Sequence, residues 1–192
     1  MVLRQQGRER RLTLVRETAG RLFREQGYET TTVRQIAAAA GVSTGTVMSC
    51  GDKATLLLQT VEDAIGALMP PVGPVEVDLD PVDVVWRCFA PYFDFYASVP
   101  ELARPYTVLL LSAGPDHPAL GAQAEMFITA VATRIRLGCP GAGEEAAGLT
   151  AEGLFAAYLH ALLTWVSGVA ELEAAVAGFR RQIDWQLARF RT

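Results

Sequence analysis

A short run of hydroxyl side chains and glycine, Ser43-Thr44-Gly45-Thr46, has the chemistry needed to contact a phosphate backbone. Ser43 is a good N-cap for a very short helix that begins at Thr44, and the first backbone N–H groups of such a helix point outward. Thr44 and Thr46 offer short hydroxyls for base edges or phosphates, and Gly45 removes a side chain where a nucleic acid must come close. Each threonine is equally suited to capping a helix, which is the alternative that the pattern leaves open.

Basic residues are concentrated in the N-terminal third of the chain. The net charge is −4, but residues 1–60 hold nine of the 17 Lys and Arg residues and only five of the 21 Asp and Glu residues. This segment therefore carries +4 and the remainder −8. A basic end on an acidic body is typical of a footprint for a polyanion, although a solvated helix face gives the same pattern. Arg34, just before the Ser43 run, can reach a phosphate from its own helix.

Signatures of catalysis and of metal binding are missing from the sequence. We find no G-x-S-x-G, Walker loop, G-x-G-x-x-G or H-E-x-x-H motif, and His117 and His160 do not form a catalytic constellation. The three cysteines are widely spaced and fit neither a zinc pattern nor a disulfide framework. The N-terminal residues contain no apolar run of the kind found in signal peptides. We therefore expect no enzyme activity, no metal, no cofactor and a cytoplasmic protein.

Apolar periodicity predicts three helices around the Ser43 run. Apolar residues recur at helical spacing over residues 9–26, and Gly27 is placed to end that helix. Thr31 or Thr32 can cap a second helix, which Gly41 ends. Three helices within about forty residues, the last two joined by a tight turn with glycine, are typical of a helix-turn-helix.

The residues of this segment also resemble a known family. Thr-Thr-Val-x-x-Ile-Ala-x-x-Ala-Gly-Val-Ser-x-Gly-Thr, residues 31–46, is similar to the DNA-binding helix-turn-helix of tetracycline-repressor (TetR) type regulators, and the likeness covers about residues 8–60. It implies a regulator that binds double-stranded operator DNA and senses a small molecule. Lys53 lies where family members place a phosphate-binding lysine. The residues expected at the DNA are Thr32, Arg34, Ser43, Thr44, Gly45, Thr46, Met48 and Lys53.

The segment from Met48 to Cys50 departs from the family pattern. Met48 stands where the family has a tyrosine, and the segment is one residue short, as if Cys50 replaced an aromatic pair. Methionine has no hydroxyl for a phosphate, and a missing phenylalanine removes a core anchor. Two functions therefore stay open: a repressor that binds a palindromic operator with fewer contacts, and a helical small-molecule sensor whose DNA binding is impaired or lost.

The prolines and glycines divide the rest of the chain. A fourth helix is expected from about Asp52 to Met69, followed by a linker over residues 70–80 that contains Pro70-Pro71-Val72-Gly73-Pro74. No segment alternates with period two, so we expect an all-α protein of about nine helices. A helix-turn-helix head, residues 1–52, is joined by the fourth helix to a helical ligand-binding and dimerisation body, residues 53–192. Further helix starts are expected at Pro81 after an Asp80 cap, at Pro100, at Pro118, at Thr150 after a glycine-rich loop over 138–148, and at Glu171.

The body contains enough bulky side chains to line a pocket for an effector. Pockets of this kind are mostly apolar with a few polar groups, so we expect a small, largely hydrophobic effector. Each of these residues is also suited to a plain core position. The pocket candidates are Trp86, Phe89, Phe93, Tyr96, Tyr106, Phe127, Tyr158 and His160.

The last two helices are the candidates for a homodimer interface. Stripes of small residues permit close helix approach, and two helices from each subunit would form a four-helix bundle. The same stripes are also suited to packing inside one subunit. The expected interface residues are Ala157, Ala161, Thr164, Gly168, Ala174 and Gly178. The uncharged run between Glu152 and Glu171 could just span a bilayer, but we read it as a buried helix, and a membrane-associated protein or an all-helical enzyme is the remaining alternative.

Overall fold

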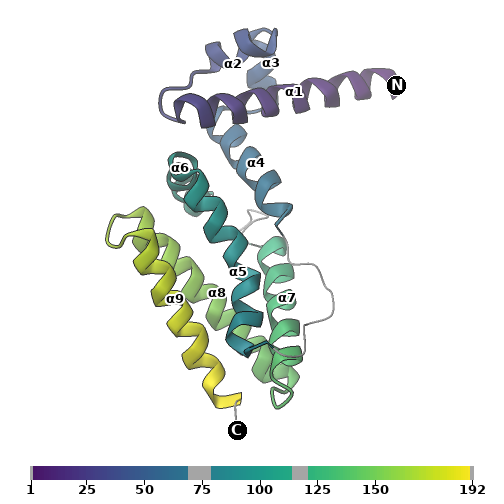
Figure 1. Ribbon diagram of the computed structural model, residues 1–192. Coiled ribbons are helices and arrows are strands. Elements are labelled where there is room, and N and C mark those ends of the chain that lie inside the picture. Colours follow the sequence, from purple (N-terminus) through teal and green to yellow (C-terminus); the bar gives the residue numbers. More distant parts are fainter. Residues whose placement is uncertain (1, 69–78, 114–120, 191–192) are drawn as a thin grey trace. The chain divides into compact units, whose positions relative to one another are not determined.

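The computed structural model describes residues 2–68, 79–113 and 121–190, and these are helical with no strand (Figure 1). They divide into two compact units, one from Met1–Ala67 with Val99–Ser112, the other from Leu68–Ser98 with Ala113–Thr192. The expected all-α class and helix number are confirmed within the described residues. The helices are α1 (Val2–Gln26), α2 (Val33–Ala40), α3 (Thr44–Cys50), α4 (Lys53–Gly66), α5 (Pro81–Ser98), α6 (Pro100–Ser112), α7 (Ala122–Gly138), α8 (Glu144–Val166), α9 (Leu172–Leu187) and a 3-10 turn, η1 (Ala188–Phe190).

The first unit contains α1 to α4 and also α6. The helices α2 and α3 lie together on one side of α1, and α4 and α6 pack against each other and against α1 (Figure 1). This unit is therefore larger than the head predicted over residues 1–52. Its core is formed by fully buried apolar side chains from four helices: Val15, Ala19, Phe23, Ile36, Val47, Leu56 and Leu57.

Gly20 of α1 lies against a side chain of α4. A Cβ atom added to Gly20 would lie 2.6 Å from Cγ2 of Thr60, so a larger residue here would require Thr60 or the helices to shift. Beside it, Arg16 Nη1 on α1 pairs with Asp63 Oδ2 on α4 at 3.4 Å. The pair is partly exposed, so it adds little stability to the contact between α1 and α4.

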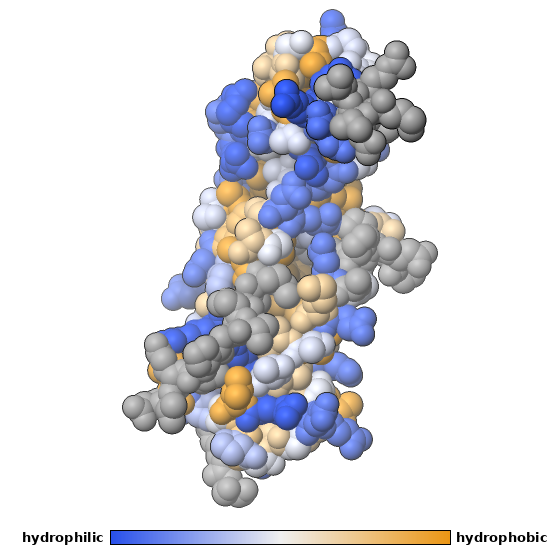
Figure 2. All heavy atoms as spheres, turned by 90° about the vertical axis from the view of Figure 1, so that its right-hand side faces the viewer, coloured by the Kyte–Doolittle hydropathy of each residue, from blue (hydrophilic) through white to orange (hydrophobic). Residues whose placement is uncertain are grey.

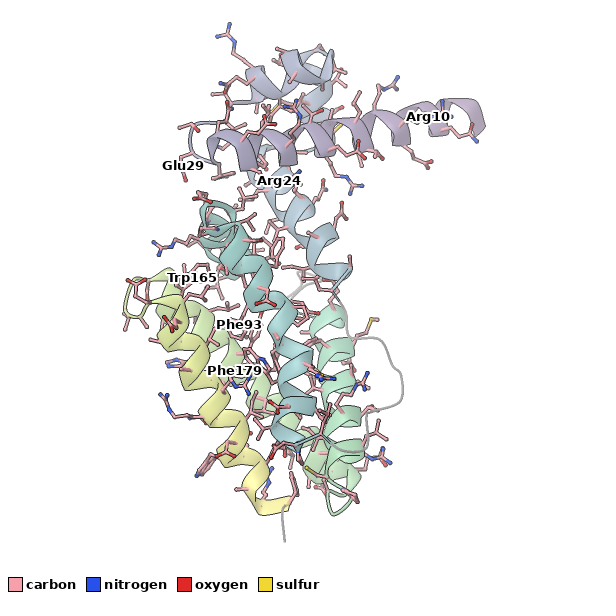
Figure 3. The ribbon with its side chains drawn as sticks, viewed as in Figure 1. Arg10, Arg24, Glu29, Phe93, Trp165 and Phe179 are labelled. Atoms are coloured by element: carbon pink, nitrogen blue, oxygen red, sulfur yellow. The ribbon has the colours of Figure 1, made fainter. Side chains whose placement is uncertain are left out.

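The second unit is a bundle of α5, α7, α8 and α9 with an aromatic core. Helix α5 packs against α7 and α9, and α8 packs against the same two helices. The Phe89 ring of α5 lies at its centre, with ring centroids 4.7 Å from Phe179, 5.0 Å from Phe127 and 5.5 Å from Tyr158. Figure 3 shows Phe93 and Phe179 pointing toward each other, and their centroids are 5.7 Å apart.

Local signals predicted the start of α5 correctly and the start of α8 wrongly. Asp80 Oδ1 accepts the Val82 N–H at 2.8 Å, and Pro81 is the first helical residue, as expected. Helix α8 begins at Glu144, not at Thr150, because two glutamates in its first turn complement the helix dipole. Thr150 is instead buried inside the helix, where its hydroxyl donates to the Ala146 carbonyl. The expected linker up to residue 78, the expected end of the fourth helix at Met69 and the expected start at Pro118 lie outside the described residues.

One described helix, α8, is long and apolar enough to cross a membrane by length and composition alone. Its buried face includes Leu154, Tyr158, Leu162 and Trp165, which pack within the second unit. Of the apolar window, 39% is buried inside the structure, and a single helix of this kind is weak evidence of a membrane span. On the face of the molecule drawn in Figure 2, hydrophilic and hydrophobic residues are interspersed, as is usual for a protein surface.

Candidate nucleic-acid interface

The helix-turn-helix begins at Thr32, which caps α2 through its side-chain hydroxyl and its backbone N–H. The Thr32 side chain accepts the Gln35 N–H at 3.3 Å, and the Gln35 Oε1 accepts the Thr32 N–H at 2.8 Å, which together form a capping box. Thr31, the other capping candidate, is buried and donates to the Gly27 carbonyl at 2.8 Å. Thr32 thus has a defined structural role at the start of α2, and its side chain is still exposed.

Gly41 ends α2 and directs the chain into α3. Its φ of 65° and ψ of 32° are left-handed, a conformation that glycine adopts without strain. The Val42 N–H then donates to the Ala37 carbonyl at 3.0 Å, which closes the turn. Ser43 caps α3, as predicted, because its Oγ accepts the Thr46 N–H at 3.0 Å. The Ser43 Oγ also lies 2.9 Å from Thr46 Oγ1, so the Thr46 hydroxyl is already engaged.

Helix α3 has one buried side and one open side. Val47 is fully buried in the head core, whereas Met48 is 53% exposed and Thr44 and Gly45 are exposed. A Cβ atom added to Gly45 would meet only Ser43 Oγ, at 3.7 Å, an ordinary contact. Nothing in the described fold therefore requires glycine at position 45. The open side combines a bare backbone, one hydroxyl and one methionine, a surface that another molecule can approach closely.

The atypical segment from Met48 to Cys50 is accommodated by the turn that follows it. Gly51 has a φ of 143°, and a Cβ atom there would lie 2.8 Å from Thr55 Cγ2 and 2.9 Å from Thr55 Cβ. This glycine lets the chain turn sharply from α3 into α4. Cys50 is half-buried, and its Sγ lies 3.3 Å from the Thr46 carbonyl. The head core closes through Val47, Leu56 and Leu57, without the aromatic pair that the family pattern would place here.

The first residues of α4 are held by two different polar contacts. Asp52 caps the helix, because its Oδ1 accepts the Thr55 N–H at 2.7 Å. This hydrogen bond holds the pKa of the Asp52 carboxyl below its usual range. Lys53 Nζ donates to the carbonyls of Tyr28 and Glu29, at 2.9 Å and 3.4 Å. The ammonium that the resemblance assigns to a phosphate is therefore engaged with the loop between α1 and α2.

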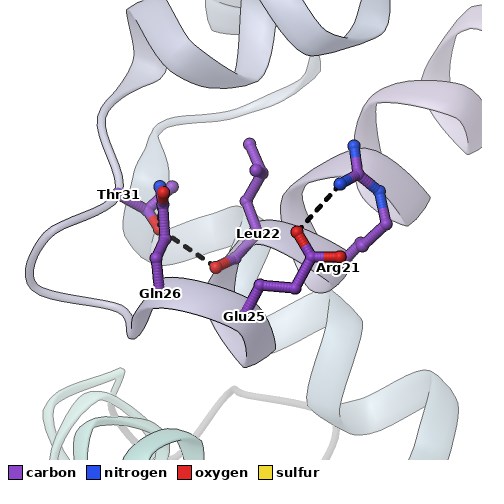
Figure 4. A network of polar contacts seen from close by, with 5 residues as sticks. All are labelled: Arg21, Leu22, Glu25, Gln26 and Thr31. Carbon is purple, nitrogen blue, oxygen red and sulfur yellow. Dashed lines mark hydrogen bonds and ion pairs between the residues drawn. The ribbon is translucent and has the colours of Figure 1, made fainter.

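The arginines of the head differ in how they are used. Arg21 pairs with Glu25 at 2.9 Å along α1 (Figure 4). Beside this pair, Thr31 Oγ1 accepts the Gln26 Nε2–H at 3.1 Å and lies 3.4 Å from the Leu22 carbonyl, so these contacts hold the end of α1. Arg34, in contrast, is exposed in the first turn of α2, seven residues before Gly41. Of the predicted basic contacts, Arg34 is the one whose side chain stands open to an external phosphate.

The predicted pocket residues fall into three groups. Trp86, Phe89, Phe93, Tyr96, Phe127 and Tyr158 share the aromatic core of the second unit. Tyr106 is buried in α6, in the first unit, and His160 is exposed on α8, so neither joins that core. Burial raises the pKa of Tyr92 and of Tyr96 to about 12, so both phenols stay protonated and can donate hydrogen bonds.

Phe179 is the core residue that sequence reasoning missed. Its ring lies within 6.4 Å, centroid to centroid, of Trp86, Phe89, Phe93 and Tyr158. It is not among the pocket candidates, and its large ring in the apolar pattern of the last helix is the signal that the sequence offers. Nearby, Arg180 Nη2 pairs with Asp83 at 2.9 Å and its guanidinium stacks 4.8 Å from the Trp86 ring centroid, which ties α9 to α5.

The predicted interface residues are only partly at the surface. Ala161 is buried within the second unit, and Thr164 donates its hydroxyl to the Ala161 carbonyl. Gly168 is exposed in the turn after α8, where its φ is 75°. Ala174 is exposed on α9, while Ala157 and Gly178 are half-exposed. The outward stripes instead include Ala156, His160 and Leu163 on α8 and Ala174, Ala177, Arg181 and Trp185 on α9.

In the part of the chain that the structure describes, no cluster of three or more His, Cys, Asp or Glu side chains is arranged to hold a metal ion. The polar chemistry of the head is therefore that of hydroxyls, backbone N–H groups and arginines. Such groups bind phosphates and base edges directly.

Comparison with known proteins gives matches to the head and to the whole chain. Residues 15–49 match the family model of bacterial regulatory proteins, tetR family. The fold is similar to that of a TetR transcriptional regulator from Rhodococcus sp. RHA1, with 19% identity, coverage of 96% of this chain and 97% of that one, and a TM-score of 0.68. It is also similar to FadR of Thermus thermophilus, a TetR family transcriptional repressor solved in complex with lauroyl-CoA, with 22% identity, coverage of 92% and 93%, and a TM-score of 0.61. A search of curated protein sequences found no match.

Proposed function

We propose that this protein is a dimeric repressor, because residues 15–49 belong to the tetR family of bacterial regulatory proteins and the chain has the fold of TetR transcriptional regulators. It binds a palindromic operator in double-stranded DNA and is released by a small, largely hydrophobic effector. It acts in the cytoplasm, without a membrane and without catalysis, as expected of a regulator of this fold. The matched family and fold support a regulator.

The open side of α3 is the observation that carries this proposal. Thr44, Gly45 and Met48 are exposed, while Val47 anchors the opposite side in the core. In a helix-turn-helix, the second helix enters the major groove and its N-terminal residues contact base edges. A glycine that the fold does not need is explained by a duplex that comes close to the backbone at this position. Arg34 supplies a phosphate contact from α2.

A palindromic operator requires two copies of the head. The half-sites of such an operator lie about 34 Å apart, so each subunit of a two-fold dimer supplies one α3. We place the dimer contact on α8 and α9, where Leu163 is 41% exposed and Trp185 is 75% exposed. Large apolar side chains that are exposed on the single subunit are typical of residues that become buried anchors when two subunits associate. The small residues Ala174 and Gly178 on α9 permit close approach of the partner helices.

We place the effector among the aromatic rings of the second unit. These rings are closely packed, with Phe89 and Phe179 centroids 4.7 Å apart, so an effector must separate them to bind. The surroundings are apolar, and the buried phenols of Tyr92, Tyr96 and Tyr158 add polar groups. The lauroyl-CoA bound by FadR carries a long apolar chain, which supports an effector of similar character for this fold. An effector that prefers one arrangement of the bundle shifts the population toward it. Helix α4 leads from the head toward the second unit along the chain and is the lever in this mechanism.

The second candidate function is a sensor of the same fold whose head has lost operator binding. The atypical segment favours it, because Met48 has no hydroxyl with which to bind a phosphate. The two functions have the same fold and the same effector, and they differ only in whether the head binds an operator.

Selection of duplexes from a random-sequence pool separates the two functions. A repressor enriches a palindrome, which then binds the purified dimer with an affinity that falls as salt rises. A gel shift with the DNA upstream of its own gene checks the same point. Failure to enrich any sequence and to shift any duplex at low salt contradicts the repressor and leaves the sensor. Mass spectrometry of small molecules that copurify with the protein identifies the effector.

A further inference from the structure

Among the residues that the structure describes, Lys53 makes three polar or ring contacts with the loop between α1 and α2. Its Nζ donates to the Tyr28 carbonyl at 2.9 Å and to the Glu29 carbonyl at 3.4 Å, and it lies 4.2 Å from the centroid of the Tyr28 ring. An ammonium has three N–H donors, so two hydrogen bonds and a ring face occupy most of its binding capacity. A phosphate contact would have to use the remaining N–H or replace one of these interactions.

Tyr28 connects this contact to the core of the head. Its ring packs edge-on against Phe23, with centroids 5.4 Å apart, and Phe23 is fully buried. Burial, with the neighbouring carboxylates of Glu29 and Asp52, raises the pKa of Tyr28, so the phenol stays neutral beside the ammonium. The lysine therefore rests on a ring that is itself fixed by the core.

The loop that Lys53 holds determines where α2 begins. Gly27 ends α1 with a φ of 86°, and the Thr31 hydroxyl donates back to the Gly27 carbonyl. Thr32 then starts the capping box of α2. Only four residues separate Gly27 from Thr32, so a shift of this loop shifts the start of α2 directly.

We propose that Lys53 is a positioning residue, which fastens the loop between α1 and α2 to the first turn of α4 and thereby orients α2 and α3, and that it does not contact a DNA phosphate. The consequence for affinity rests on the proposed operator binding. The contact itself is independent of DNA, so its failure and the failure of the proposed function are observed separately.

Lys53 is the only lysine in the chain, which makes the contact directly visible. Protein labelled with 13C-lysine gives a single Hε–Cε resonance, and the ring current of Tyr28 displaces it upfield from its random-coil position. Tyr28→Leu removes this displacement. The proposal predicts that the wild-type resonance stays displaced when a duplex selected by the wild-type protein is added. A resonance at the random-coil position without DNA, or one that moves there on DNA binding, overturns the proposal.

The salt dependence of binding to the same duplex tests the second half of the proposal. Lys53→Met keeps a side chain of similar length without the charge, and Arg34→Met is the matched control for an exposed arginine. We expect Lys53→Met to weaken binding about tenfold, from the loss of charge-assisted hydrogen bonds, with the slope of log K against log salt unchanged. Arg34→Met makes that negative slope shallower by about 0.9, the value for one phosphate. If Lys53→Met makes the slope shallower by the same amount, or leaves the affinity unchanged, the positioning role is contradicted.

Discussion

Gly51 and Thr55 are so close that a Cβ atom on Gly51 would lie 2.9 Å from the Thr55 Cβ. The clash involves the first side-chain atom of Thr55, which a rotamer change does not move. Gly51 also has a φ of 143°, outside the range that other residues favour. Gly51→Ala is therefore expected to lower the free energy of unfolding by about 1–3 kcal/mol, the usual cost of overpacking. Urea denaturation measures this, and a variant as stable as wild-type would show that the turn into α4 is not as tight as described.

The Asp52 cap makes the stability of the head dependent on pH. Its pKa is lower in the folded chain than in the unfolded chain, because the carboxylate accepts the Thr55 N–H. A lowered carboxyl pKa contributes stability that is present above the unfolded value, about 3.9, and is lost as the pH falls through the folded value. Asp52→Ala should cost about 1 kcal/mol at pH 7, and the difference from wild-type should shrink below about pH 4. Thermal unfolding of both proteins across this range checks it, and a difference that is constant with pH would rule out the charged cap.

Phe179 is expected to be among the residues most sensitive to truncation in the second unit. It is 2% exposed and contacts rings from α5 and α8. Phe179→Ala leaves a cavity among these rings and should lower the free energy of unfolding by about 3–5 kcal/mol. The exposed Met126, truncated to alanine, is the control and should change stability by less than about 0.5 kcal/mol. A small effect of Phe179→Ala would mean that the rings do not form a packed core.

Trp185 tests the proposed dimer. An aspartate at this position of α9 should leave the fold intact, since Trp185 is 75% exposed. In a dimer it would place a charge in an apolar contact, and we expect Trp185→Asp to sediment as a monomer. Met126→Asp, on α7, changes a similarly exposed apolar residue off the proposed contact and should remain dimeric. If Trp185→Asp also remains dimeric, the contact is not on this face.

Short-range signals were sufficient for much of the head. Thr32 and Ser43 in the head, and Asp80 before α5, cap helices where their types and spacing predict, because capping depends on residues two or three positions apart. Thr150 is the exception: it has the residue type of a cap, but the helix propensity and charges of the residues before it extend the helix past it.

Contacts between distant residues could not be predicted from the sequence. Lys53 reaches carbonyls about 25 positions earlier in the chain, and nothing in the local pattern identifies those partners. Phe179 meets α5 across nearly a hundred residues, and His160 faces outward although its neighbours on α8 are apolar. Residue type indicates what a side chain can do, while packing decides which partner it has.

Gly45→Ala tests the central claim most directly, because stability and DNA binding should change in opposite directions. The added methyl group meets only Ser43 Oγ, at 3.7 Å, and alanine is the better helix former, so the free energy of unfolding should stay the same or rise by up to about 1 kcal/mol. On the selected duplex, the same methyl group stands between α3 and the DNA, and the affinity should fall about tenfold or more. An alanine variant that is equally stable and binds the duplex as tightly as wild-type would contradict the account, since the open side of α3 would then not face the DNA.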